Sequence, residues 1–134
     1  MKLLLDTHIL LWTLADDARL PDQARMLVEN ADNAIYYSIA SLWGVETKHV
    51  AHPDKLAFGS QEVDAFCRQS GFRQLPIKMA HISALAALDR KEGAPPHKDP
   101  FDRIMVCQAS VEGMLLVTSD EKVAGYANPC ILKV

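Results

Sequence analysis

The order of apolar and polar positions divides the chain into short buried runs and longer helical patterns. Residues 1–5, apolar except for Lys2, form a short run without polar alternation, which ends at Asp6 and passes at once into a helical pattern. A run of this kind is typical of a strand buried on both faces in a parallel sheet. Residues 114–117 form a similar run, and Asp120 follows closely. The pattern therefore predicts two central strands whose carboxyl ends each lead to an aspartate.

The remaining patterns alternate between the same two kinds of element. Apolar residues at helical spacing predict helices over 9–15, 21–29, 38–50, 61–70, 79–89, 100–112 and 121–126. Further short apolar runs predict strands over 34–37, 72–77 and 131–134. Strands that alternate with helices imply an α/β fold with a central, mostly parallel sheet of four to five strands, flanked by helices.

Composition adds limits to this prediction. The 134 residues, 49% of them hydrophobic, suit a single domain over residues 1–134, and there are no internal repeats. The net charge of −3 and the pI near 5.9 argue against a broad basic surface that grips nucleic acid over many phosphates. We therefore expect any contact with nucleic acid to be short.

Three cysteines and the start of the chain indicate the compartment. Cys67, Cys107 and Cys130 are odd in number and lie among apolar residues, as reduced core thiols do. Asp6 interrupts the first apolar run too early for a signal peptide or a membrane helix. We therefore expect a cytoplasmic protein with no membrane segment.

Three aspartates are the candidates for chemistry. Asp6 and Asp120 follow the two central strands, at the edge of an α/β sheet where ligands bind, and Asp102 lies in the first turn of a predicted helix. Taken singly, each could be a helix cap, since aspartate is a favoured N-cap. Taken together, three acids at one edge repel one another unless a cation is bound. Such carboxylates suit Mg²⁺ or Mn²⁺, and the chemistry that follows is phosphodiester hydrolysis by a metal-bound water.

The histidines and nearby cations offer weaker candidates. None of the five histidines has a paired ligand spacing, which argues against a zinc site. His97 and Lys98 end the clearest loop of the sequence, over 93–98, and Arg103 lies near the start of the helix that follows. His97 and Lys98 are either solvated loop residues or contacts to substrate phosphate. Arg103 either forms a salt bridge on the helix surface or contacts substrate phosphate.

Four segments carry a family resemblance, namely Leu3-Leu4-Leu5-Asp6-Thr7-His8, Ser38-Ile39-Ala40-Ser41-Leu42-Trp43, Asp99-Pro100-Phe101-Asp102-Arg103 and Leu116-Val117-Thr118-Ser119-Asp120. In this order they resemble the successive motifs of PIN-domain proteins of the VapC toxin type, over nearly the whole chain. The resemblance implies a PIN fold, a metal-dependent endoribonuclease activity on RNA, homodimerisation, and neutralisation by a cognate antitoxin.

The resemblance also assigns roles to residues. It makes Asp6, Asp102 and Asp120 the metal-binding, catalytic acids. It gives supporting places near the site to three other polar residues: Thr7, Ser41 and Asp99.

One position departs from the family pattern. The residue after Ser-Leu-Trp is typically a glutamate that serves as a fourth acid, and here it is Gly44. Glycine inside a helix is about 1 kcal/mol less favourable than alanine, and a glutamate here could have closed a capping box with Ser41. Glu46 is the nearest acid, but two residues along a helix turn it about 200° away.

Three explanations of Gly44 stay open: a substituted or engineered inactive form, a natural protein with weakened metal binding, or a distorted helix start that lets Glu46 substitute. We expect reduced activity, because a lost carboxylate weakens a site for a hard cation. The alternative function is a catalytically weak or inactive PIN domain that acts by binding its antitoxin or RNA. A receiver-type phosphoacceptor module shares the sheet architecture, but this chain lacks a paired acid after its first strand.

Overall fold

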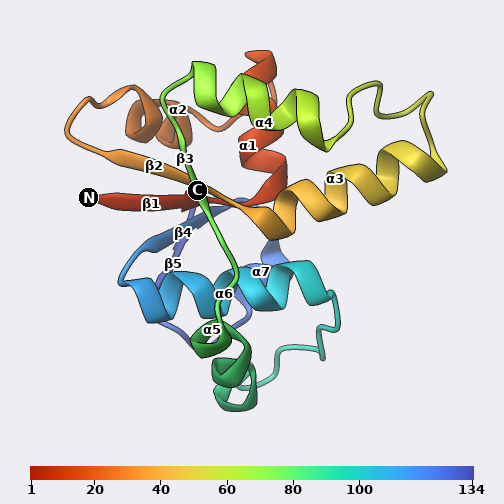
Figure 1. Cartoon of the computed structure of the whole chain (residues 1–134). Helices are drawn as coiled ribbons and strands as arrows, with labels where there is room; N and C mark the ends of the chain where they lie inside the picture. The colour runs from red at the N-terminus through yellow and green to blue at the C-terminus, as the bar shows by residue number, and fades with distance from the viewer.

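A single parallel sheet organises the chain (Figure 1). The computed structural model describes all residues, 1–134. Five strands lie in the order β3-β2-β1-β4-β5, and each neighbouring pair is parallel. They are β1 (Lys2–Leu5), β2 (Ala34–Ser38), β3 (Arg73–Leu75), β4 (Leu115–Thr118) and β5 (Ile131–Lys133). The predicted α/β class and parallel sheet are confirmed.

Helices cover both faces of the sheet. They are α1 (Thr7–Ala15), α2 (Asp22–Glu29), α3 (Ile39–Ala51), α4 (Ser60–Gln69), α5 (Met79–Ser83), the 3₁₀ helix η1 (Ala84–Ala87), α6 (Pro100–Glu112) and α7 (Glu121–Ala124). In Figure 1, α1, α2 and α4 lie on one side of the sheet and α5, α6 and α7 on the other. No helix is long and apolar enough to cross a membrane.

The central strand explains why the first apolar run shows no alternation. Leu3 and Leu5 belong to the core beneath α1 and α2, whereas Leu4 belongs to the core beneath α6. All three side chains are fully buried. Side chains of successive strand residues point to opposite faces, so a strand between two helical layers needs apolar residues at every position.

Two predicted helices end earlier than their apolar spacing indicates. The helix expected over 79–89 is α-helical only as far as Ser83, tightens into η1, and becomes extended at Leu88. The helix expected over 121–126 ends at Ala124. For the second helix the cause is tertiary, because Tyr126 pairs instead with Arg90 in an isolated antiparallel bridge.

Candidate active site

Asp6 stands at the carboxyl end of β1, the centre of the sheet. Its side chain is buried, with Oδ1 accepting a hydrogen bond from the Thr7 amide (2.8 Å) and Oδ2 accepting one from the Thr118 hydroxyl (2.7 Å). Burial raises the pKa of Asp6 above its usual value, against the opposing effect of these two hydrogen bonds. Asp6 is thus both the cap of α1 and a rigidly held acid.

Asp120 follows the neighbouring strand β4, and the Thr118 hydroxyl links it to Asp6. That hydroxyl accepts a hydrogen bond from the Asp120 amide (3.0 Å) while it donates to Asp6. The Asp120 carboxylate accepts a hydrogen bond from the Lys122 amide (2.8 Å), which caps α7. Thr118 joins the two strand ends, a role that its position in an apolar run did not reveal.

Asp99 and Asp102, both at the start of α6, have different roles. Asp99 caps the helix, accepting hydrogen bonds from the amides of Phe101 (2.9 Å) and Asp102 (3.2 Å). Asp102 caps nothing, and the contact of its carboxylate is with His97, whose Nε2 lies 3.3 Å from Oδ2. Capping therefore accounts for the position of Asp99 and not for that of Asp102.

The carboxylates of Asp6, Asp102 and Asp120 form what we call the acidic edge. Burial and, after it, the neighbouring charges of Asp6, Asp99 and Asp120 together raise the pKa of Asp102 to about 7. The acids predicted from the two strand ends and from α6 are therefore close enough to oppose one another's ionisation. Positive charge at this edge would relieve that opposition.

His97 is turned inward rather than toward solvent. Its side chain is 8% exposed and lies between Asp102 and Tyr126, with Nδ1 3.1 Å from the tyrosine oxygen. Burial lowers the pKa of His97, so the ring is uncharged near neutral pH. Contact of this ring with an RNA phosphate would require the loop to open. Lys98 is exposed, and Arg103 is half-buried with Nη1 3.4 Å from the His97 carbonyl oxygen.

Two hydroxyl groups connect α1 to α3 behind the acidic edge. The Thr7 and Ser41 oxygens lie 2.8 Å apart, and the Ser41 hydroxyl also points at the sulfur of Met105 (3.4 Å). The cap of α3 is Ser38, whose side chain accepts a hydrogen bond from the Ala40 amide, so Ser41 lies inside the helix. The idea of a capping box between Ser41 and residue 44 was therefore wrong.

Gly44 lies on the same face of α3 as Ser41, one turn further along. A Cβ atom built on Gly44 would lie 3.5 Å from Cδ2 of Phe101, at ordinary contact distance. Phe101 directly precedes Asp102 in the first turn of α6. A side chain at position 44 would therefore fit, and it would lie against the helix start that carries Asp102.

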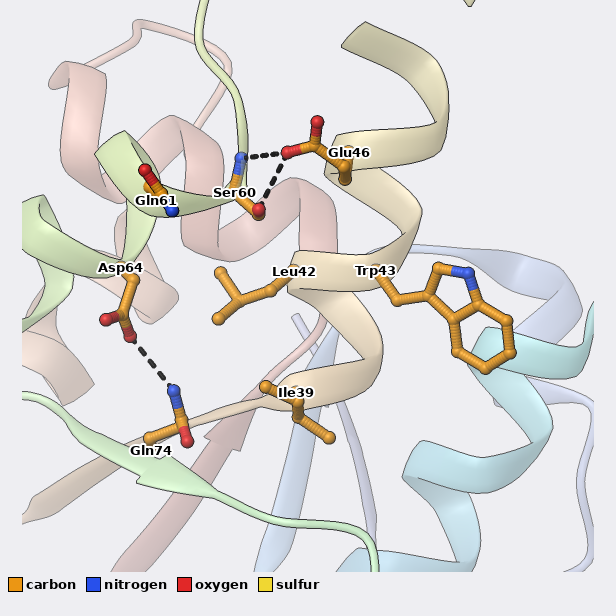
Figure 2. Close-up of a pocket in the computed structure, with 8 residues that line it drawn as sticks. All are labelled: Ile39, Leu42, Trp43, Glu46, Ser60, Gln61, Asp64 and Gln74. Carbon is orange, nitrogen blue, oxygen red and sulfur yellow. Dashed lines mark hydrogen bonds between the residues drawn. The ribbon is translucent and has the colours of Figure 1, made fainter. Parts of the chain in front are cut away.

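Glu46 points toward Ser60 at the start of α4, as Figure 2 shows. Its Oε1 accepts hydrogen bonds from the Ser60 amide (2.9 Å) and the Ser60 hydroxyl (2.7 Å) at the start of α4. These bonds lower the pKa of Glu46. Helix α3 is continuous through Gly44. The distorted helix start that would let Glu46 substitute for a fourth acid is absent, and its carboxylate instead borders a groove of about 390 Å³ between α3 and α4.

The donor chemistry of the acidic edge suits a hard divalent cation. Its carboxylate oxygens are the ligands that Mg²⁺ and Mn²⁺ prefer, and burial together with the neighbouring acids raises the pKa of Asp102, which a bound cation would oppose. No three acidic, histidine or cysteine side chains converge into a preformed metal cluster. Mg²⁺ needs only one or two carboxylates, because it keeps several of its waters. The residues present therefore fit such an ion, with Gly44 leaving one expected ligand out.

The parallel sheet with acids at its carboxyl edge defines the class of fold, and comparisons identify the family. The model of the PIN domain family matches residues 3–129. Among solved structures, the fold is similar to a chain in the crystal structure of VapBC2 from Rickettsia felis bound to a DNA fragment from their promoter. The TM-score is 0.66 at 18% identity, covering 100% of this chain and 98% of that one. No curated protein sequence matches the chain.

This chain belongs to the PIN domain family, since the family model spans nearly all of it. The PIN domain implied by the four motifs is thereby confirmed, and the chain shares its fold with a chain of the VapBC2 structure.

Proposed function

We propose that this PIN domain is a Mg²⁺- or Mn²⁺-dependent endoribonuclease of the VapC toxin type, with activity reduced by Gly44. The observation that carries the proposal is the acidic edge itself. Asp102 is a largely buried carboxylate that caps no helix and faces two further acids from adjacent strands. A fold gains no stability from such an arrangement, so binding of a cation is its best explanation.

Asp6, Asp102 and Asp120 would hold the cation. When bound, a divalent ion supplies a Lewis acid for a phosphate oxygen and a water of lowered pKa. Thr118 and the Thr7 amide fix both oxygens of Asp6, so this acid keeps its orientation before substrate arrives. Asp99 sets the first turn of α6 and thereby the position of Asp102.

The RNA would lie across the acidic edge and make few contacts to its phosphates. Lys98 is exposed beside Asp99, and Arg103 follows Asp102 on α6. Both cations would balance phosphate charge next to the acids. The net charge of −3 supports a short contact rather than a long basic track.

A specific observation also supports the alternative, a PIN domain that acts by binding. Position 44 faces the start of α6 without a carboxylate, and Glu46 is committed to Ser60. With fewer anionic ligands, cation affinity falls while the fold is unaffected. In that case the domain would bind its antitoxin or RNA without cutting RNA at a useful rate.

The antitoxin partner is inferred from the VapBC2 structure and from one groove. Between α1 and α4 lies a groove of about 350 Å³ with apolar walls that include Leu11, Trp12 and Phe66. Lys48 and Lys55 stand at its rim, so it suits an apolar segment that carries acidic residues. An arginine of the same antitoxin could pair with the acidic edge and compete with the cation.

The proposal also includes a homodimer and a cytoplasmic location. The location is supported by the three cysteines, which are all unpaired thiols.

Cleavage of a labelled RNA pool with Mn²⁺ and with a chelator tests the proposal. We expect cleavage that depends on Mn²⁺, that is lost in Asp120→Asn, and that is faster in Gly44→Glu. Cleavage in the presence of chelator, or undiminished cleavage by Asp120→Asn, would contradict the assignment. No cleavage by the natural sequence together with cleavage by Gly44→Glu would favour the binding function.

A further inference from the structure

A tyrosine that the sequence did not single out lies behind the acidic edge. Tyr126 is 1% exposed, and its hydroxyl lies 3.1 Å from Nδ1 of His97 and 3.4 Å from the carbonyl oxygen of His97. The other ring nitrogen, Nε2, lies 3.3 Å from Oδ2 of Asp102. The imidazole therefore bridges a buried hydroxyl and a carboxylate of the acidic edge.

The surroundings hold Tyr126 and the His97 loop in this arrangement. The Arg90 guanidinium lies over the Tyr126 ring, with Cζ 4.5 Å from the ring centroid. It donates to the carbonyl oxygens of Pro95 (2.8 Å) and Lys122 (2.6 Å), one on each side of the cluster. Backbone pairing of Arg90 with Tyr126 adds a further link. A cluster fixed at this many points keeps the imidazole from rotating freely.

The tautomer of the His97 ring decides whether the Asp102 carboxylate faces an N–H group or a nitrogen lone pair. A neutral imidazole carries one N–H and one lone pair, and the partner of one nitrogen fixes the role of the other. Burial raises the pKa of Tyr126, so its hydroxyl remains a donor. Of its two acceptors, Nδ1 is nearer than the carbonyl oxygen. A hydroxyl that donates to Nδ1 places the N–H on Nε2, directed at the Asp102 carboxylate.

We infer that Tyr126 is a positioning residue for the acidic edge: its hydroxyl fixes the Nε2–H tautomer of His97, and that N–H orients the carboxylate of Asp102. The inference rests on the proposed function in that Asp102 must be a working acid. Metal-binding carboxylates and histidines are commonly oriented by such outer hydrogen bonds, and their loss weakens metal affinity about 10- to 100-fold.

Nitrogen NMR of the metal-free protein tests the tautomer without any activity. In the spectrum of the imidazole nitrogens above about pH 8, where the ring is neutral, we expect protonation at Nε2 of His97. Tyr126→Phe, which keeps the ring under Arg90 and removes only the hydroxyl, should convert His97 to a mixture of tautomers. Protonation at Nδ1 in the natural sequence, or an unchanged tautomer in Tyr126→Phe, would overturn the inference. The tautomer in the natural sequence can be measured even if Tyr126→Phe fails to fold, and protonation at Nδ1 there would by itself overturn the inference.

Mn²⁺ affinity measured by calorimetry tests the consequence for Asp102. We expect Tyr126→Phe to lose about tenfold in affinity and to cause no further loss in a His97→Ala background, because both changes act through one contact. Tyr36→Phe is the matched control, since Tyr36 also lies under an arginine, Arg73, with 6.0 Å from Cζ to the ring centroid. Unchanged affinity in Tyr126→Phe, or equal losses in both tyrosine variants, would overturn the positioning role. Affinity that does not depend on Asp102 at all would instead refute the proposed function, while the tautomer result still stands.

Discussion

At the scale of single residues, the metal-free fold disfavours the ionised form of the Asp102 carboxyl. Its carboxylate is largely buried, and burial together with neighbouring acids raises its pKa to about 7. Above that pH the folded protein must hold an anion that the unfolded chain holds more easily. The ionised carboxylate therefore lowers stability in the pH range where a metal-dependent enzyme would need it.

Removing this charge should stabilise the metal-free protein. Asp102→Asn is expected to raise the free energy of unfolding by about 1 to 3 kcal/mol near pH 8, less than the full pKa shift implies because the site is partly solvated. Urea unfolding in the presence of a chelator measures this. Asp54→Asn, at an exposed position between α3 and α4, is the control and should change little. A destabilised Asp102→Asn variant would show that the carboxylate is structural.

Gly44 gives a second prediction at the same scale. Gly44→Glu and Gly44→Gln should each gain about 1 kcal/mol of helix stability over glycine, and their Cβ atoms fit against Phe101. Only the glutamate adds an anion, so only Gly44→Glu should tighten Mn²⁺ binding, on the order of tenfold. Calorimetric titration of both variants measures the difference. Equal Mn²⁺ affinities would mean that position 44 does not face the cation.

At the scale of elements, local signals predicted starts better than ends. Asp6, Asp99 and Asp120 cap the helices that follow them, as their side-chain chemistry indicated. The end of the helix expected over 121–126 was not predictable from local spacing, because Tyr126 pairs instead with Arg90, far away in the sequence. Helical spacing reports local preference, and tertiary pairing overrides it here.

The joint between β1 and β4 should be sensitive to one hydroxyl. Thr118→Val removes the donor to Asp6 and the acceptor for the Asp120 amide, at a fully buried position. We expect a loss of about 1 to 3 kcal/mol in the free energy of unfolding. Thr47→Val removes a hydroxyl that is bonded only to the Trp43 carbonyl, at an exposed position of α3, and should lose far less in the same denaturation experiment. Equal losses of unfolding free energy in the two variants would show that the Thr118 hydroxyl contributes nothing beyond the change in secondary-structure propensity.

The contact between α4 and the sheet should depend on pH through Asp64. The Tyr37 hydroxyl (2.6 Å), followed by Arg68 and Gln74, lowers the pKa of Asp64 below its usual 3.8. A carboxyl whose pKa is lower in the folded state stabilises the fold above its unfolded pKa and loses that effect as pH falls through the folded pKa. The stability difference between the natural sequence and Asp64→Asn should therefore be constant above about pH 5 and shrink as the pH falls through the lowered pKa of Asp64. A difference that persists in acid would contradict an electrostatic origin.

At the scale of the whole molecule, the sheet order assembles the site. Strands β1 and β4 are parallel neighbours, so Asp6 and Asp120 lie at the same edge although they are 114 positions apart in the sequence. This much followed from two apolar runs that each lead to an acid. The inward turn of His97 and the place of Tyr126 did not follow, because both depend on how the loop before α6 packs against the chain after α7.

Membership of the PIN domain family settles the fold more firmly than the activity. The family model and the parallel sheet agree over nearly the whole chain. The proposed activity depends on few atoms, and Gly44 stands where the family resemblance implies a carboxylate. A fold maintained by its two cores can therefore persist while the cation site weakens.

The most direct test of whether the acidic edge is a cation site is a calorimetric Mn²⁺ titration of the natural sequence and of Asp102→Asn. Both titrations are made at the same pH, near 8, and the unfolding temperature of each protein is measured with and without Mn²⁺. We expect one Mn²⁺ to bind the natural sequence and to raise its unfolding temperature, as any ligand of the folded state does. Asp102→Asn should be the more stable protein without metal and yet gain nothing from Mn²⁺. Equal Mn²⁺ binding and equal stabilisation in both proteins would contradict the assignment of Asp102, and with it the proposed nuclease site.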